Sequence, residues 1–223
     1  MEIKIIRKDK EKLSFLVKGT DVWIVNALRR VAIESVPVLA IDEVEFVKND
    51  SVLYDEVIAH RLGLVPLKTE VRALKLRESC TCSGKGCNRC TIVLKMAVKG
   101  REVLATDLKS KAIEVPYEMP ITKLMPEQEI ELQAFSRLGT GKEHAKFIPG
   151  LVWHTYVPVD LNLNNKDDSI KALHPHEDGK FLDNAFIFNI ESWGQLKPEE
   201  ILSNSVSALS KKLTELGKSI EKI

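Results

Sequence analysis

The chain has 223 residues, 44% of them hydrophobic, which allows one large domain or two small ones and excludes an intrinsically disordered protein. Its 33 basic and 32 acidic residues leave a net charge of +1, which argues against a protein that coats nucleic acid or membranes with positive charge. No apolar stretch approaches the ~20 residues of a membrane span and the N-terminus lacks a signal-peptide cleavage site, so we expect a soluble, cytoplasmic protein.

The first fifty residues predict a hairpin, a helix and a strand. Apolar and polar residues alternate on both sides of a charged turn over residues 1–19, as in two paired strands. A helix is expected over residues 20–35, capped by Thr20 or Asp21 and ended before Pro37. Residues 39–47 then predict a strand, whose expected inward residues are Ile41, Val44 and Phe46.

The rest of the chain predicts short elements and one long terminal helix. We expect a helix over residues 55–62, a strand over 91–98 and a polar loop over 162–180. A helix from Pro198 to Ile223 would carry a two-in-seven apolar seam. This seam either covers the chain's own core or partly meets a helix of another chain; its members are Leu202, Val206, Leu209, Leu213, Leu216, Ile220 and Ile223.

All four cysteines fall in the segment 80–90, with the spacing C-x-C-x4-C-x2-C. A secreted disulfide framework would scatter its cysteines, so this cluster indicates one local site. Four thiolates suit a tetrahedral zinc ion without an open position, which makes the predicted site structural. An iron–sulfur cluster and free or paired thiols remain alternatives; the predicted ligands are Cys80, Cys82, Cys87 and Cys90.

The segment 68–101 around these cysteines is basic. Its nine Lys or Arg and two Glu give a charge of +7, which can offset the thiolates or face an acidic partner or phosphates. No aromatic residue occurs between Tyr54 and Tyr117, so the stacking platform of a single-strand binder is missing. We therefore favour a solvated or protein-facing surface over a nucleic-acid surface.

No catalytic motif is present in the sequence. The segment Gly139–Lys142 is similar to part of a phosphate-binding loop. It does not match the G-x4-G-K-[ST] motif of such a loop, since Glu143 rather than Ser or Thr follows the lysine. The pair His174 and His176 can bind a metal, but such a pair in a polar stretch is more often part of a plain loop. The sequence thus predicts no active site.

Several segments resemble one known family, the alpha-like assembly subunits of multisubunit RNA polymerases. Its signature is similar to residues 26–31 (NALRRV), 34–37 (ESVP) and 40–44 (AIDEV). Residues 49–67, 141–146 and 188–194 resemble the archaeal and eukaryotic branch, and the archaeal D-type subunits in particular. The resemblance covers nearly the whole chain.

The resemblance implies a two-domain α+β fold. A discontinuous dimerisation domain would consist of residues 1–45 plus 180–223, and an inserted, mostly β domain of residues 46–179 would carry the cysteine loop. Many archaeal members add an insertion that holds an iron–sulfur cluster. Here no cysteine follows Cys90 and residues 159–180 are too few for that insertion.

The resemblance also implies a function and partners. The chain would be a non-catalytic scaffold of a DNA-directed RNA polymerase that pairs with a smaller alpha-like subunit of the archaeal L type. Further expected partners are the second-largest subunit and small subunits of the N and P types, with DNA reached only through the complex. The expected interface residues are Asn26, Arg29, Arg30, Leu209, Leu213, Leu216 and Ile220.

Two other function classes remain to be separated from this one. A stand-alone zinc-loop module that binds nucleic acid would use the same cysteines and basic segment. A thiol oxidoreductase would use the C-x-x-C pair, but no thioredoxin-like strand and helix precede it.

Overall fold

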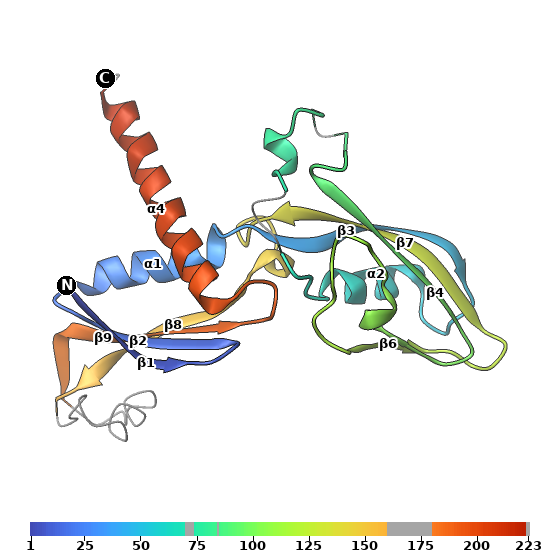
Figure 1. The fold of residues 1–223 in the computed structure, drawn as a ribbon, viewed down its shortest axis with the longest axis horizontal. Helices are drawn as coiled ribbons and strands as arrows, with labels where there is room; N and C mark the ends of the chain where they lie inside the picture. Colours follow the sequence, from blue (N-terminus) through green and yellow to red (C-terminus); the bar gives the residue numbers. More distant parts are fainter. Residues whose placement is uncertain (70–73, 84, 160–179, 222–223) are drawn as a thin grey trace. The chain divides into compact units, whose positions relative to one another are not determined.

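The computed structural model describes residues 1–69, 74–83, 85–159 and 180–221, and the chain divides into two compact units. Unit 1 is formed by Met1–Val36, Pro149–Trp193 and Lys197–Ile223, and unit 2 by Pro37–Ile148 and Gly194–Leu196. Unit 1 therefore joins the two ends of the chain, and unit 2 is inserted between them in the sequence (Figure 1).

Unit 1 is built on a four-stranded antiparallel sheet with the strand order β1-β2-β9-β8. The N-terminal hairpin of β1 (Glu2–Lys8) and β2 (Lys12–Lys18) confirms the predicted hairpin. Strand β2 pairs with β9 (Phe181–Ser192), which pairs in turn with β8 (Gly150–Pro158). Phe15 lies opposite Phe188 in this register, and their stacked rings are 5.2 Å apart.

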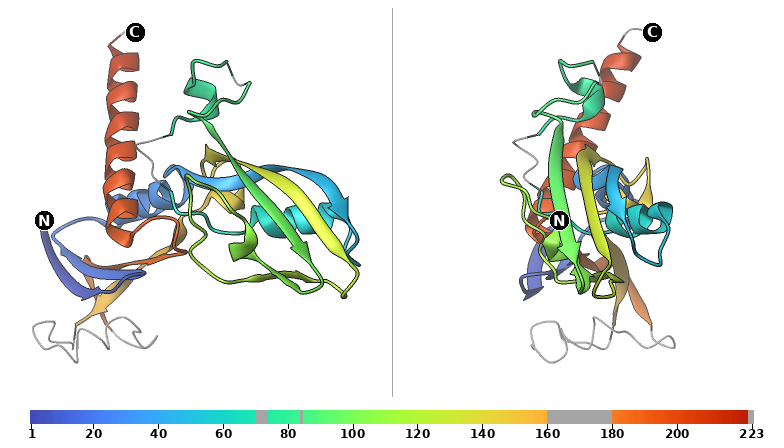
Figure 2. Two further views of the ribbon diagram at one scale, coloured as in Figure 1. Left: turned by 45° about the vertical axis from the view of Figure 1, so that its right-hand side comes forward. Right: turned by 90° about the vertical axis from the view of Figure 1, so that its right-hand side faces the viewer.

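Of the two helices of unit 1, α1 (Val22–Glu34) packs on one face of this sheet, whereas α4 (Pro198–Ile220) meets that side only with its first turns and then extends away from the sheet (Figures 1 and 2). Helix α1 follows Asp21 as its N-terminal cap residue and buries Val25, Val31 and Ala32. Helix α4 has Pro198 in its first turn, as predicted, and buries Ile201 and Ser205. Residues 222 and 223, to which the predicted helix extended, lie outside the described residues.

Unit 2 contains a three-stranded antiparallel sheet in the order β3-β7-β4, with β7 in the centre. Its strands are β3 (Val38–Asn49), β7 (Glu129–Gly139) and β4 (Thr91–Lys99). A second pair joins β5 (Glu102–Leu104) and β6 (Pro120–Lys123). Helix α2 (Asp55–Gly63) packs on β3, and three short 3-10 turns are η1 (Arg77–Ser79), η2 (Ala105–Asp107) and η3 (Ala145–Phe147).

The core of unit 2 lies between α2 and the sheet and includes Ile58, Leu62, Leu94, Ile130 and Leu132. The predicted helix over 55–62 and strands over 39–47 and 91–98 are confirmed. Ile41 is buried, and Val44 and Phe46 pack against the core, as predicted. A bulge at Asp42 explains how Ile41 and Val44, three positions apart, share one face.

The boundaries of the two units differ from those of the predicted domains. Unit 2 starts at Pro37 rather than at 46, because β3 pairs along its whole length with β7. Unit 1 resumes at Pro149 rather than at 180, because β8 pairs with β9. Most of the polar loop predicted over 162–180 lies outside the described residues. Among the residues described, no helix combines the length and apolar character that a membrane span requires.

Candidate functional site

The four cysteines converge on one point in the segment between η1 and β4. The Sγ atoms of Cys80 and Cys87 are 3.6 Å apart, as are those of Cys82 and Cys90. All four Sγ atoms lie within 4.8 Å of one another, and none of the four residues forms a disulfide. Cys80 and Cys90 are buried, and Cys82 and Cys87 are half-buried.

The spacing of the sulfur atoms fits one tetrahedral ion. Four sulfurs at about 2.3 Å from a central zinc ion would lie about 3.8 Å from one another. The three shortest observed separations are 3.6, 3.6 and 3.9 Å, the last between Cys87 and Cys90. Four sulfur donors without an open position are typical of a structural site, so the cluster can hold one metal ion and is compatible with zinc.

Local hydrogen bonds fold the backbone around this point. The Cys90 N–H donates to the Cys87 carbonyl at 2.9 Å, and the Lys85 N–H donates to the Cys82 carbonyl at 3.2 Å. The Cys87 N–H also donates to Cys90 Sγ at 3.3 Å. Gly86 has a φ of +83°, and a Cβ there would lie 3.3 Å from Thr91 Oγ1, so both backbone and space favour glycine.

The thiol of Cys82 has a lowered pKa. Desolvation raises the pKa of Cys82, but hydrogen bonds from Cys80, Cys90 and the Gly86 backbone outweigh it and lower the pKa to about 6. The lowered pKa favours the thiolate form of Cys82. The thiolate is the form that binds metal ions.

Acidic residues from elsewhere in unit 2 neutralise part of the basic segment around the cysteines. Arg77 Nη1 lies 3.0 Å from Glu43 Oε1 on β3, and Lys68 forms an ion pair with Glu114. Residues 70–73 of this segment lie outside the described residues. The described part therefore presents less net positive charge than its own composition suggests.

The three predicted interface residues of α1 differ in their surroundings. Arg29 Nε and Nη2 both donate to Oδ1 of Asn26, at 3.0 and 2.9 Å, and both side chains are half-buried. Arg30 is exposed, with Nε 3.6 Å from Glu34 Oε1. Burial lowers the pKa of His154 on β8, and the charge of Arg29 lowers it further. The Asn26–Arg29 pair is thus a fixed feature of α1, whereas Arg30 lies in solvent.

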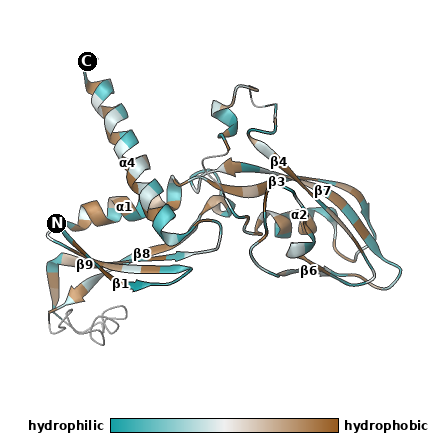
Figure 3. Cartoon of the chain, viewed as in Figure 1, coloured by the Kyte–Doolittle hydropathy of each residue, from teal (hydrophilic) through white to brown (hydrophobic). Residues whose placement is uncertain are grey.

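The apolar seam of α4 is largely exposed. The exposed fractions of Leu213, Leu216 and Ile220 are 61, 57 and 61%, and Leu209 is half-buried. Hydrophobic and hydrophilic residues alternate along the helix (Figure 3). Among the predicted seam members that the structure describes, none is fully buried; the helix buries Ile201 and Ser205 instead. The hypothesis that the seam covers the chain's own core is therefore wrong for Val206 and for the positions from Leu213 to Ile220.

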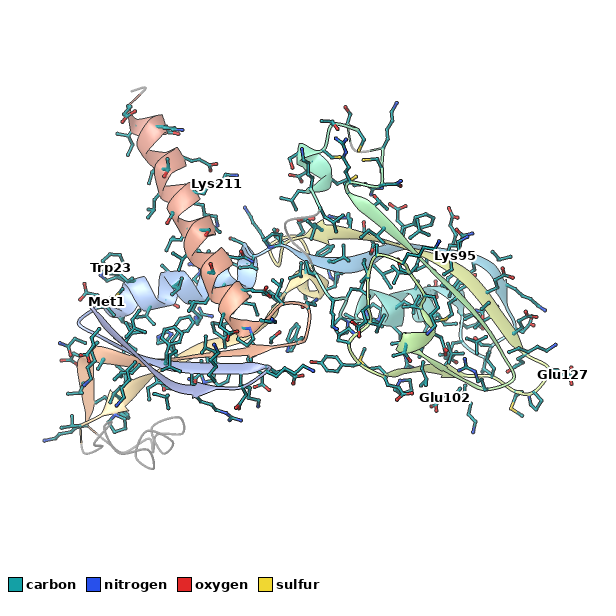
Figure 4. All side chains as sticks on the ribbon, in the orientation of Figure 1. Met1, Trp23, Lys95, Glu102, Glu127 and Lys211 are labelled. Carbon is teal, nitrogen blue, oxygen red and sulfur yellow. The ribbon has the colours of Figure 1, made fainter. Side chains whose placement is uncertain are left out.

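Unit 1 has further exposed apolar residues that were not predicted from the sequence. Trp23, in the first turn of α1, is 67% exposed (Figure 4), and its neighbours Val22 and Ile24 are exposed as well. Ile3 and Ile5 on the edge strand β1 are each 58% exposed. The sequence does contain a sign of this exposure at the start of α1. Val22, Trp23 and Ile24 are three consecutive apolar residues, and these cannot all lie on the side of a helix that faces the core.

Two weaker candidates from the sequence remain, the segment Gly139–Lys142 and the pair His174 and His176. In the segment Gly139–Lys142, the Thr140 N–H donates to Glu143 Oε1 at 3.0 Å, so a side chain of this protein already accepts from that backbone donor. His174 and His176 lie outside the described residues. Within the described ranges, the four cysteines form the only cluster of three or more His, Cys, Asp or Glu suited to an ion.

Comparisons with known proteins agree on one family. Residues 14–213 match the family described as the RNA polymerase Rpb3/Rpb11 dimerisation domain. The chain is 31% identical over 260 residues to the DNA-directed RNA polymerase subunit Rpo3 of Archaeoglobus fulgidus, covering 100% of this chain and 98% of the relative.

Two further relatives come from different branches of life. The Rpo3 subunit of Thermococcus kodakarensis is 33% identical over 256 residues, which cover 95% of each chain. The RNA polymerase II subunit rpb3 of Dictyostelium discoideum is 31% identical over 282 residues, which cover 96% of this chain and 93% of the relative.

Proposed function

The chain belongs to the Rpb3/Rpo3 family of non-catalytic, alpha-like subunits of DNA-directed RNA polymerase, and from this premise we propose how it assembles with its partners. It pairs with a smaller alpha-like subunit, of the archaeal L type, through unit 1. This heterodimer then nucleates the addition of the large catalytic subunits.

The exposed seam of α4 is the observation that carries this proposal. Leu213, Leu216 and Ile220 repeat with the spacing of a helix–helix seam and are more than half exposed. Trp23 adds a large apolar side chain on α1 of the same unit. Water-exposed apolar surface of this kind is typical of a surface that a partner covers, so the chain alone is expected to self-associate.

Hydrogen exchange along α4 tests the proposed pairing. Addition of the purified smaller alpha-like subunit should slow amide exchange in residues 206–220, which the partner helix would cover. Exchange in the buried strand β7 of unit 2 serves as the internal control and should not change. Unchanged exchange along α4 in a mixture with the partner would refute this interface.

We propose that α1 contacts the second-largest polymerase subunit through Asn26, Arg29 and Arg30. The double hydrogen bond to Asn26 supports this role, because it holds the Arg29 guanidinium in one orientation before any partner binds. Small subunits of the N and P types complete the proposed assembly, and DNA is reached only through the complex.

A charge reversal tests this second contact. Arg29→Glu should leave the heterodimer with the smaller subunit intact and weaken capture of the second-largest subunit. Lys10→Glu, an exposed change in the β1–β2 turn of the same unit, is the matched control. Equal capture by both variants would contradict the assignment of Arg29.

We further propose that the four cysteines hold one structural zinc ion, with Cys80, Cys82, Cys87 and Cys90 as ligands. The closed set of four sulfur donors supports zinc, whose role there is to order the loop between η1 and β4. Elemental analysis of the heterodimer should find about one zinc per chain. An iron chromophore without zinc would overturn the assignment.

We propose an archaeal origin, with the chain as a D-type polymerase component and hence a place in the cytoplasm, because the Rpo3 relatives from Archaeoglobus fulgidus and Thermococcus kodakarensis are similar to it over nearly their whole length. Fractionation of the native cells, with detection of this chain in the cytosolic polymerase peak, tests it.

A further inference from the structure

Arg77 of η1 links the cysteine loop, residues 80–90, to the sheet of unit 2. Its Nη1 lies 3.0 Å from Oε1 of Glu43, a residue of β3. Its Nη2 lies beside the turn of the loop, where a Cβ added to Gly86 would be 3.4 Å away. The guanidinium therefore lies between a strand of the sheet and the residue that precedes Cys87.

The sheet end of this link is held by the strands around it. Glu43 lies opposite Phe135 of the central strand β7, directly after the bulge at Asp42. The carboxylate of Asp42 accepts a hydrogen bond from Arg137 of β7 at 2.7 Å. The backbone that carries Glu43 thus has a strand partner and a neighbouring ion pair, so Glu43 offers Arg77 an anchor in the ordered part of unit 2.

The loop end of the link lies next to two of the predicted ligands. The Cβ position at Gly86 that faces Arg77 is also 3.3 Å from Oγ1 of Thr91, the first residue of β4. The turn therefore fits between the guanidinium and the start of the strand. The next residue, Cys87, donates its N–H to Cys90 Sγ at 3.3 Å. A shift of this turn would move both the Cys87 ligand and a hydrogen bond to the Cys90 sulfur.

The backbone of Arg77 contacts the loop as well. The Cys80 N–H donates to the Arg77 carbonyl at 3.4 Å, where η1 leads into the loop (Figure 1). The Arg77 side chain is 29% exposed and its Nε is buried. The position of the guanidinium is therefore set by the protein around it, whereas a fully exposed arginine would sample many conformations.

Acidic and basic groups both surround this side chain. A hollow of about 570 Å³ beside Arg77 is further lined by Asp42, Glu78, Ser83, Arg137 and Glu143. Three of these groups pair with one another, since Arg137 contacts both Asp42 and Glu143. The pairing with Glu43 is thus separate from that cluster.

Two other basic residues lie on the loop itself, and both Lys85 and Arg89 are exposed. A zinc ion with four thiolates has two excess negative charges, so any nearby positive charge favours it. Within the described part of the chain, Arg77 is the one of these three basic residues whose side chain pairs with the sheet. A role of the link can therefore be separated from a role of charge alone.

We propose that Arg77 is a positioning residue of the metal site and that Glu43 acts on the site through it. The link holds the turn at Gly86 in place and so slows the loss of the metal ion. Groups outside the ligand set that orient the ligands typically tune metal affinity in this way. This inference rests on the proposed zinc site and adds two residues that do not bind the metal themselves.

Competition with a chelator tests this role on the zinc-loaded, full-length chain. Release of zinc to pyridylazoresorcinol is followed by absorbance. Arg77→Gln and Glu43→Gln should each release zinc about fivefold faster than the wild type, which is the upper end expected for a partly exposed ion pair. The double variant should release it no faster than Arg77→Gln, because both changes break the same link.

The matched control is Arg89→Gln, the same exchange at an exposed residue beside Cys90. It removes a positive charge near the sulfur atoms and leaves the link intact, so zinc release should equal that of the wild type. Equally fast release from Arg89→Gln and Arg77→Gln would assign the effect to charge and overturn the proposal. Wild-type release from Glu43→Gln would overturn it as well.

Hydrogen exchange shows where the effect is located. In zinc-loaded Arg77→Gln and Glu43→Gln, amide exchange should increase in residues 85–87 and remain as in the wild type in β7. An equal increase in β7 would mean a general loosening of unit 2 and would contradict the positioning role.

The outcomes also separate this inference from the zinc proposal. A wild-type chain that binds no zinc would refute the metal site and the role of Arg77 together. A wild-type chain that binds zinc, with Arg77→Gln and Glu43→Gln variants that release it at the wild-type rate, would refute only the role of Arg77.

Discussion

Arg137 of β7 donates from Nε to Oδ2 of Asp42 at 2.7 Å, where Asp42 is the bulged residue of β3. Lys146 occupies the other carboxylate oxygen of Asp42, and Glu143 accepts a second hydrogen bond from Arg137. The Arg137 guanidinium also lies 4.9 Å from the centre of the buried Phe147 ring. A single carboxylate thus joins two strands and the loop 140–147.

Loss of the Asp42 charge should destabilise unit 2. Asp42→Asn keeps the size of the side chain but takes from Lys146 its anionic partner and from Arg137 one of two, the other being Glu143; the Arg137 and Lys146 side chains are 21 and 15% exposed. Charged hydrogen bonds of this kind contribute about 2 kcal/mol, so the free energy of unfolding should fall by about that amount. Urea unfolding followed by far-ultraviolet circular dichroism measures it.

The matched control is Glu129→Gln, which removes an ion pair to Lys48 on the surface of the same unit. The side chains of that pair are 48 and 35% exposed, more than those of the Asp42 cluster, so its loss should leave the unfolding curve nearly unchanged. Equal effects of the two variants would mean that the Asp42 cluster contributes no more than a surface pair.

The same cluster predicts how the stability of unit 2 depends on pH. Burial raises the pKa of Asp42, but its bonds to Arg137 and Lys146 outweigh burial and lower the pKa below the ordinary 3.8. The pKa of Glu143 is lowered below 4.5 in the same way, since Arg137 and Thr140 outweigh desolvation. A lowered folded-state pKa stabilises the protein above the unfolded value, and this contribution is lost as the pH falls.

Stability should therefore be constant above about pH 5 and decline between about pH 5 and 3, where these carboxylates take up protons. Thermal unfolding at successive pH values gives the profile. Asp42→Asn should make the decline shallower, because it removes one of the unit 2 carboxylates whose pKa is lowered, while Glu143 and Asp107 remain. A decline of the same steepness in this variant would assign the pH dependence to other carboxylates.

Loss of one cysteine ligand should loosen unit 2 and leave unit 1 folded. Cys87→Ser removes one of four sulfur donors and with it most of the metal affinity, so the loop between η1 and β4 should lose its order. All three tryptophans, Trp23, Trp153 and Trp193, belong to unit 1. Their fluorescence should therefore stay native, while amide exchange at the start of β4 increases.

Thr81→Ser changes an exposed residue of the same loop and should leave both signals as in the wild type. Treatment of the wild-type chain with a chelator should reproduce the effect of Cys87→Ser. A Cys87→Ser chain that retains one metal ion and wild-type exchange would show that this cysteine is not a ligand.

Charges in the α4 seam should prevent pairing without unfolding the chain. Leu213→Asp with Leu216→Asp changes two residues that are already more than half exposed, so unit 1 should keep its tryptophan fluorescence. In the heterodimer the two charges would be buried without partners, at a cost of several kcal/mol on the order of other buried charges. Co-purification with a tagged smaller subunit should then fail.

Ser207→Asp with Thr214→Asp adds the same charge to the same helix. Both positions are exposed and lie outside the seam, so this control should co-purify normally. Loss of pairing in both double variants would point to a general effect of charge on α4 rather than to the seam.

Local patterns in the sequence predicted most of the elements but not the extent of the units. The hairpin, α1, α2 and α4 follow from alternation, caps and proline positions within short segments. The units depend instead on pairings between distant segments, such as Val38 with Gly139 and Val152 with Ile190. Strand patterns predict that a strand exists and leave its partner open.

The parts of the candidate site also differ in how well the sequence predicted them, because some depend on neighbouring residues and others on distant ones. The cysteines are close in sequence, so their spacing alone predicted a single cluster. The seam of α4 was predicted from the period of its apolar residues. A period does not show which side of the helix is buried, and in the structure the buried side contains Ile201 and Ser205. The Asp42 cluster joins residues up to 104 positions apart and left no local signal.

The mass of the chain in solution with its partner tests the central claim most directly. Size-exclusion chromatography with light scattering should show an association-prone chain when it is alone. An equimolar mixture with the smaller alpha-like subunit should give a single peak with the mass of a one-to-one heterodimer, and the Leu213→Asp, Leu216→Asp chain should give none. A wild-type chain that stays a stable monomer in dilute solution and ignores the partner would contradict the account.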